Sequence, residues 1–342
     1  MRCFYDPRTE GHDPDFRLTN GRIVRNAERR QRADFLREGL TALGLDTEVP
    51  PDVPMAAVRA VHTDRFLDFL ATAWTDWQDL KDPGPEVVPS AFAQKEWATY
   101  PEGVLPRAGW HMGDTSAPIG EHSWTATLAA AGCAVAAADA VLGGDRAAYA
   151  LSRPPGHHSD SETAAGHCLL NVSAIAAERL RTVHDRVAIL DIDVHHGNGT
   201  QRIFYDRGDV FFASVHAETS AYYPFFTGYA AERGTGAGEG RNLNLPLSRD
   251  TTDAAWIAAI ERALDAIADF APGALVLSLG LDAHENDPLE GMKVTFDGFR
   301  KAGALIAAAG HPTVIVQEGG YLSPDLATSL QSALGGFLGR PA

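Results

Sequence analysis

Short, wholly apolar runs alternate with helical patterns through the second half of the chain, and this alternation most limits the folds open to it. Such runs, separated by helices, indicate a parallel sheet covered by helices on both faces. The expected strands are 2–5, 148–151, 187–190, 210–215, 274–279 and 313–316. The expected helices are 30–43, 125–143, 174–181, 254–270 and 299–309. The sequence therefore predicts a single α/β domain over residues 1–342.

Composition narrows the class of protein further. The formal net charge is −16 and no basic stripe is present, so nucleic acid is not an expected ligand. The three cysteines, Cys3, Cys133 and Cys168, stand far apart and form no disulfide framework, which fits a reducing cytoplasm. The N-terminus has no signal-peptide pattern, and the Ala-rich stretch 125–143 is too weakly hydrophobic to span a bilayer. We expect a cytoplasmic chain without a membrane partner.

One segment, residues 75–122, breaks the alternating pattern. It is rich in Pro and Gly, and five of the six Trp residues lie between Trp74 and Trp124. A loop this long inside a compact domain is usually functional or part of an interface. Aromatic side chains suit a subunit interface and an internally packed lid equally well. We predict a homodimer formed through this inserted loop, with the packed lid as the alternative.

Polar motifs follow the apolar runs at four places. They are Arg-Pro-Pro-Gly-His-His at 153–158, Asp-Ile-Asp-Val-His-His-Gly-Asn-Gly at 191–199, Gly-Leu-Asp-Ala-His at 280–284 and Glu-Gly-Gly-Tyr at 318–321. In open α/β sheets, ligands bind outside the carboxyl ends of the strands. The four motifs are therefore expected to meet in one site.

Two of these motifs carry candidate metal ligands. Asp191, Asp193 and His195 alternate, so an extended strand would place all three on one face. Asp193 and His195 can then reach one cation, and Asp282 from another strand end completes the set. Two carboxylates and one imidazole suit zinc, with iron(II), cobalt(II) or manganese(II) as alternatives. The alternative, that these acids only cap loops, would leave them buried without a partner, which is costly. His196 faces the opposite side and is expected to be structural.

The remaining motifs carry candidate proton-transfer groups. A neutral histidine in the pair His157 and His158 can accept a proton and return it to a leaving amine. Asp191 and Asn198 are natural partners for the far ring nitrogens. A carboxylate partner favours an imidazolium, so the histidine held by Asn198 is the better base. Tyr321 can donate to a developing oxyanion. The alternative, a surface histidine pair without catalytic function, leaves these partners unexplained. Together the residues predict metal-dependent hydrolysis of an amide.

These four motifs resemble those of the histone deacetylase superfamily, over nearly the whole chain. Arg32 and the segments 62–67 and 212–216 are similar to that family as well. The closest likeness is to bacterial acetylpolyamine amidohydrolases, which carry a comparable inserted loop. Here that likeness runs through Trp74, Trp77, Gly109-Trp110 and 119–124.

The resemblance implies an arginase/deacetylase fold with a central eight-stranded parallel sheet flanked by helices. It implies one zinc ion per subunit on Asp193, His195 and Asp282, with iron(II) or cobalt(II) as substitutes. It implies that His158 is the general base and acid, that His157 pairs with Asp191, and that Tyr321 donates to the oxyanion. It also implies a structural potassium or sodium ion near Asp191, bound by backbone carbonyls of Asp193, His195 and Val215 and by the hydroxyl of Ser214. Asn198 matches the pattern of the amidohydrolases.

The chain departs from the family at the substrate tunnel. His167 stands between Gly166 and Cys168, where the family usually has an aromatic residue. The acid that reads the distal amine of acetylpolyamines is also missing, because Ser116 falls near its position and Asp114 lies close by. The opposite wall is expected from Tyr222, Tyr223, Phe225 or Phe226. The predicted substrate-binding set is Gly166, His167, Tyr223, Phe225, Phe226, Gly319 and Asp114.

Three functions are compatible with these residues. The first is deacetylation of small cationic amines, above all acetylpolyamines, with release of acetate. The second is deacylation of acyl-lysine in proteins or of other small acyl amides, which His167 and the missing acid favour. The third is a metal-retaining binding protein without turnover, although Tyr321 and both histidines are present. A two-metal ureohydrolase would need more acids than the site supplies.

Overall fold

The computed structural model describes residues 1–340 and contains one eight-stranded sheet in which every strand pairing is parallel. The strand order is β4-β1-β5-β10-β9-β6-β7-β8. The strands are β1 (Arg2–Phe4), β4 (Thr47–Glu48), β5 (Ala147–Ala150), β6 (Val187–Asp191), β7 (Val210–Ala217), β8 (Asn242–Leu247), β9 (Ala274–Leu279) and β10 (Thr313–Gln317). The predicted α/β fold with an eight-stranded parallel sheet is confirmed.

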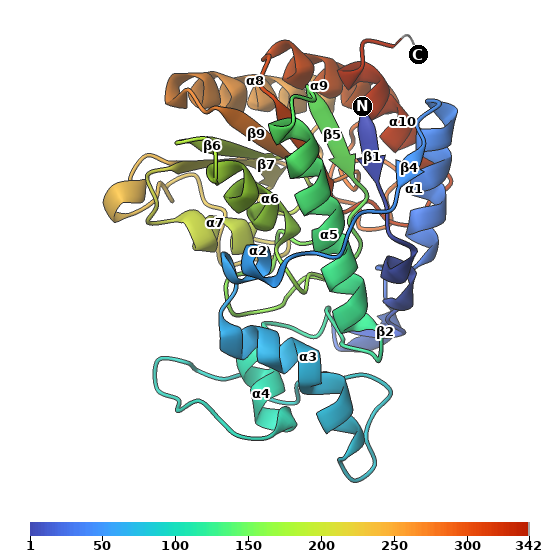
Figure 1. The fold of residues 1–342 in the computed structure, drawn as a ribbon, viewed down its shortest axis with the longest axis vertical. Coiled ribbons are helices and arrows are strands. Elements are labelled where there is room, and N and C mark those ends of the chain that lie inside the picture. The colour runs from blue at the N-terminus through green and yellow to red at the C-terminus, as the bar shows by residue number, and fades with distance from the viewer. Residues whose placement is uncertain (341–342) are drawn as a thin grey trace.

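Helices cover the sheet on both faces, which is why its central strands are largely apolar. On one face, α5 (Ser123–Leu142) and α6 (Val172–Arg181) pack on strand residues such as Val187 and Ile189. On the other face, residues such as Ala188 and Leu190 belong to a second core. That core includes side chains of α1 (Gln31–Ala42), α8 (Asp253–Phe270), α9 (Phe296–Ala308) and α10 (Leu326–Phe337). The alternation of strand side chains thus divides the protein into three layers, visible in Figure 1.

Two strands of the sheet and a separate hairpin do not follow from the apolar runs. The strand β4 has two residues, and β8 alternates polar and apolar residues and contains Pro246. Both are edge strands, where one side of the backbone needs no partner and proline is tolerated. The antiparallel hairpin of β2 (Phe16–Thr19) and β3 (Arg22–Arg25) leaves Leu18 and Ile23 exposed. None of these elements has a continuous buried stretch that would mark it in the sequence.

The most apolar helix of the described chain, α5, is long and apolar enough to cross a membrane by length and composition alone. However, 78% of its most apolar stretch is buried inside the protein. It packs against β5, β1, β10 and α6. The prediction of a buried core helix at this place is confirmed, whereas the expectation that the stretch is too weakly hydrophobic to span a bilayer is wrong by length and composition.

The segment 75–122 is less irregular than its composition suggests. The helix α3 (Asp64–Gln78) extends into it, and it contains α4 (Val104–His111), which packs against α3. Figure 1 shows both helices at one end of the molecule, away from the strands of the sheet. Trp77 and Trp110 are buried in this unit, whereas Trp97 is 81% exposed. The segment is therefore a packed unit with at least one outward-facing indole. The short helix α2 (Met55–Arg59) precedes it.

Candidate active site

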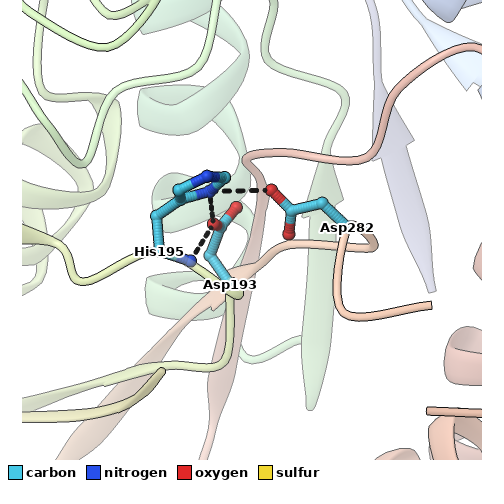
Figure 2. A group of neighbouring side chains, drawn as sticks. All are labelled: Asp193, His195 and Asp282. Carbon is cyan, nitrogen blue, oxygen red and sulfur yellow. Dashed lines mark hydrogen bonds and ion pairs between the residues drawn. The ribbon is translucent and has the colours of Figure 1, made fainter. Parts of the chain in front are cut away.

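Three potential metal ligands from two strand ends lie together (Figure 2). Asp193 and His195 follow β6, which already ends at Asp191, so they stand in a loop and not on an extended strand. Asp282 follows β9. The Nδ1 atom of His195 lies 3.1 Å from Asp193 Oδ1 and 3.1 Å from Asp282 Oδ2. Adjacent parallel strands bring these loops to the same edge of the sheet.

The cluster fits one divalent cation. Its potential ligand atoms all lie within 4.8 Å of one another, and all three residues are buried. A tetrahedral zinc ion with bonds of about 2.0–2.2 Å separates its ligand atoms by roughly 3.3–3.6 Å, close to the spacing seen here. Two buried carboxylates side by side are unstable without a positive partner. A Cβ atom added at Gly319 would collide with the carboxylates of Asp282 and Asp193, so only glycine leaves room for this arrangement.

The two histidines lie beside this cluster and have different partners. His157 Nδ1 lies 2.9 Å from Asp191 Oδ2, and His158 Nδ1 lies 2.6 Å from Asn198 Oδ1. Asn198 begins the helix α7 (Asn198–Phe204), which fixes its side chain next to the ring. The ring centroids of the two histidines are 4.1 Å apart, and His195 lies 5.7 Å from His158.

These surroundings move the pKa values of the two histidines in opposite directions. Burial alone would lower the pKa of His157, but the carboxylates of Asp193 and Asp191 raise it well above its ordinary value. Burial holds the pKa of His158 well below its ordinary value, and the charges of His157 and His195 lower it further. His157 is therefore cationic and His158 neutral near neutral pH. Only His158 has a lone pair with which to accept a proton.

Tyr321 stands a few residues beyond the end of β10, and several contacts fix its position. Its backbone N–H donates to Asp287 Oδ2 at 2.9 Å. Arg32 lies with its guanidinium 4.9 Å from the centre of the tyrosine ring and donates to the carbonyls of Gly320 and Glu318, each at 2.6 Å. Burial raises the pKa of the Tyr321 phenol well above its ordinary value, although the charge of Arg32 opposes this, and the carboxylates of Asp282 and Asp193 raise the pKa as well. The hydroxyl group therefore keeps its proton and can donate it in a hydrogen bond.

Several supporting residues of this region do not follow from sequence reasoning. Glu28 is fully buried and pairs with Arg32 and with Arg153, whose Nε lies 2.7 Å from Glu28 Oε1. Asp287 holds Tyr321, as described above, and burial raises its pKa to about 8. The only sequence pattern that indicates the Glu28–Arg32 ion pair is the spacing of four residues. Oppositely charged residues on exposed helices have the same spacing, so it does not identify a buried pair.

The predicted substrate-binding residues are brought together only in part. Tyr223 lies edge-on to His158 with 4.9 Å between ring centroids and donates to Asp114 Oδ2 at 2.6 Å. The N–H of Gly166 donates to the same oxygen at 3.0 Å. Tyr222 stacks on His195 at 5.0 Å. These residues form one wall beside the candidate metal centre.

The other predicted wall residues lie at different depths. His167 Nδ1 lies 3.0 Å from the Tyr321 hydroxyl, inside the site. Phe225 is 45% exposed, with its ring 6.1 Å from that of Tyr223. Phe226 is 86% exposed and contacts Phe225 at 6.2 Å between centroids, so it lies on the outer surface and not in the wall.

The proposed monovalent-cation residues are adjacent in the sheet. Asp191 on β6 pairs in register with Ser214 on β7, and Val215 follows directly. The Ser214 hydroxyl lies 2.9 Å from His216 Nδ1. His196 is buried and lies with Nε2 3.1 Å from Gln201 Oε1, outside the cluster of candidate ligands. The position of His196 is set by the loop after β6 and not by strand alternation.

A parallel α/β domain with a buried Asp-His-Asp cluster, paired histidines and a protonated tyrosine has the parts of a metal-dependent amidohydrolase. A model of the histone deacetylase domain matches residues 26–337. The chain therefore belongs to the histone deacetylase family, and the predicted membership of this superfamily is confirmed. It is an enzyme of the deacetylase and amidohydrolase class.

Similar proteins cover nearly the whole chain. The acetylpolyamine amidohydrolase of Burkholderia pseudomallei is 43% identical over 338 residues, 98% of each protein. The protein of the same name from Mycoplana ramosa is 36% identical over 99% of this chain and 100% of its own. The crystal structure of the acetylpolyamine aminohydrolase from Burkholderia pseudomallei superimposes with a TM-score of 0.96 at 43% identity, over 98% of both chains. The HD domain of HDA15 gives a TM-score of 0.81 at 27% identity, over 100% of this chain and 90% of that domain.

Proposed function

We propose that this chain removes acetyl groups from small cationic amines, above all acetylpolyamines, and releases acetate. The observation that carries the proposal is the convergence of Asp193, His195 and Asp282 beside a neutral His158 and the phenol of Tyr321. The names of the full-length relatives support the choice of substrate. The net charge of −16 would also attract a cationic substrate over long range.

The metal in this proposal is zinc, with iron(II) or cobalt(II) as substitutes, held by Asp193, His195 and Asp282. When bound, such an ion polarises the acyl carbonyl and makes a water molecule a better nucleophile. A potassium or sodium ion near Asp191 and Ser214 would stabilise the end of β6, which leads into the loop with the metal ligands Asp193 and His195. The adjacency of Asp191 and Ser214 in the sheet supports that assignment.

The proton steps fall to the chain's own residues. His158 Nδ1 donates to Asn198, so Nε2 carries the lone pair that takes the proton of the attacking water. The same atom then gives that proton to the departing amine. His157, cationic and paired with Asp191, adds positive charge beside the developing negative charge. Tyr321 donates its hydroxyl proton in a hydrogen bond to the oxygen of the former carbonyl.

A second candidate function has one observation in its favour. The carboxylate of Asp114 already accepts from Tyr223, Gly166 and the N–H of Ser116 at 2.7 Å. It is therefore less available to bind the distal amine of a polyamine. Deacylation of acyl-lysine or of another small acyl amide does not need such a group.

We also propose that the chain forms a homodimer through the segment 75–122 in a reducing compartment. The exposed side chains of Trp97 and Phe92 in that segment support the homodimer. The three buried free thiols support the reducing compartment. Light scattering on the full chain tests the dimer, and a monomer at micromolar concentration would remove it.

A substrate panel tests the proposed function. Acetate release is measured for N-acetylputrescine, acetylspermidine and an acetyl-lysine peptide, with the zinc- and cobalt-loaded enzyme. The variants His158→Ala and Tyr321→Phe serve as controls that should lose most of the activity. We expect the acetylated polyamines to have the higher kcat/KM. Turnover of the peptide alone would overturn the small-substrate proposal in favour of the second candidate.

A further inference from the structure

We propose that His167 is a positioning residue for Tyr321, which directs the phenol proton towards the carbonyl of the substrate. This inference rests on the proposed function, because it assigns a role in the same hydrolysis. It gives a role to the histidine that stands where the family usually has an aromatic residue.

The backbone around His167 is built to present its ring to the site. Ala165 and Cys168 exchange two backbone hydrogen bonds, at 3.1 Å and 2.7 Å, across a two-residue turn. The two residues of that turn, Gly166 and His167, both have positive φ, 54° and 71°. Such a turn favours glycine or asparagine, and histidine is also among the side chains that adopt positive φ more often than most, at some steric cost. Strained non-glycine residues of this kind concentrate at functional sites.

Within residues 1–340, the His167 ring makes one hydrogen bond, and it goes to Tyr321. His167 Nδ1 lies 3.0 Å from the phenol oxygen, and the rings are nearly perpendicular with centroids 5.4 Å apart. The other ring nitrogen, Nε2, is buried and has no partner among residues 1–340. His167 as a whole is only 4% exposed, so water has little access to that atom.

The unpartnered nitrogen decides the direction of the hydrogen bond. If Tyr321 donated to Nδ1, then Nε2 would carry a buried N–H without an acceptor, and orphaned buried donors are rare. If Nδ1–H donates to the phenol oxygen, Nε2 keeps a lone pair and no ring N–H is orphaned, and the donor left for the substrate is the phenol O–H. In this second arrangement the phenol proton is free to point at the substrate.

The electrostatic surroundings agree with a neutral imidazole in this role. Burial lowers the pKa of His167 well below its ordinary value, and the charges of Arg17 and Arg32 lower it further. The phenol of Tyr321 also stays neutral, for the reasons given above. The contact is thus a bond between two neutral groups, with its direction set by the tautomer.

A double-mutant cycle with Tyr321→Phe tests the proposal. His167→Phe keeps the flat ring and removes the nitrogens, and we expect kcat for N-acetylputrescine to fall up to about tenfold with KM unchanged. In the Tyr321→Phe background the same change should have no further effect on kcat. An equal loss in both backgrounds would show that His167 does not act through Tyr321, and would overturn the proposal.

A conservative variant separates positioning from packing. Asparagine tolerates positive φ, and its amide nitrogen takes the place of Nδ1. His167→Asn should therefore recover most of the kcat that His167→Phe loses, although it fills less volume. Activity as low as that of His167→Phe would contradict a hydrogen-bonding role.

A spectroscopic measurement makes the inference independent of the substrate. Nitrogen-15 NMR of the zinc-loaded protein should show the His167 side chain as the neutral Nδ1–H tautomer near pH 7. An Nε2–H tautomer or an imidazolium would overturn the proposal. If the wild-type enzyme hydrolyses no acetylated amine, the proposed function fails, while the tautomer still decides how His167 and Tyr321 are joined.

Discussion

The buried ion cluster of Glu28, Arg32 and Arg153 lies next to Tyr321, and its contribution to the stability of the fold can be tested directly. Glu28 is fully buried and compensates two fully buried arginines, Arg32 and Arg153. The substitution Glu28→Gln keeps the shape of the side chain and removes its charge. The two buried guanidinium groups would then lose the carboxylate with which both are paired.

The size of the expected effect follows from this burial. Breaking a buried ion pair by removing one partner costs about 3–5 kcal/mol. An unfolding entropy of about 2.1 cal/mol/K per residue, over the 342 residues of the chain, amounts to about 0.7 kcal/mol/K. Dividing the first figure by the second gives a fall in Tm of about 4–7 °C for Glu28→Gln.

A surface pair supplies the matched control. Arg2 and Glu48 form an ion pair at 2.6 Å, but their side chains are 49% and 47% exposed. Pairs this exposed contribute little to stability, so Glu48→Gln should lower Tm by less than about 1.5 °C. Circular dichroism melts of both variants at one scan rate give the comparison. Equal shifts for the two variants, or no shift for Glu28→Gln, would refute the reasoning.

Two further predictions concern single side chains. Tyr321→Phe should lower kcat about 10²–10³-fold, as loss of one oxyanion donor does, and should leave the amount of bound metal unchanged; unaltered kcat would contradict the role given to the phenol. Burial raises the pKa of Glu86 to about 7. The pKa of Glu86 in the folded state therefore lies above its pKa in the unfolded chain. Ionisation of Glu86 then destabilises the fold by an amount that grows between about pH 4.5 and pH 7 and stays constant above pH 7. Glu86→Gln should therefore raise Tm at pH 8 and progressively less towards pH 4.5, and a pH-independent change in Tm would contradict this.

The central strands could be predicted from the sequence because both of their faces are buried. A strand such as β9 must then be apolar at nearly every position, and Ser278 is its one polar residue. The edge strands β4 and β8 lack that requirement, and the exposed hairpin β2–β3 has no continuous apolar face. Their existence depends on partners elsewhere in the chain, which no local pattern reveals.

The chemistry of the site was predictable for a different reason. Acids such as Asp193 and Asp282 next to apolar strands are costly unless they bind something, so their presence is informative. The spacing argument was only partly right, because β6 ends before Asp193 and the loop, not the strand, turns the ligands inward. The supporting contacts escaped prediction because they join distant segments, as Arg32 and Gly320 do across 288 residues.

Metal analysis of the purified chain and two variants tests the central claim most directly. After loading with zinc and removal of excess metal, the wild type should hold one ion per chain, and Asp282→Asn should hold almost none. Asp287→Asn, which alters a neighbouring buried acid outside the ligand set, should still hold one. Equal zinc content in wild type and Asp282→Asn, or no zinc in the wild type, would contradict a cation bound by Asp193, His195 and Asp282.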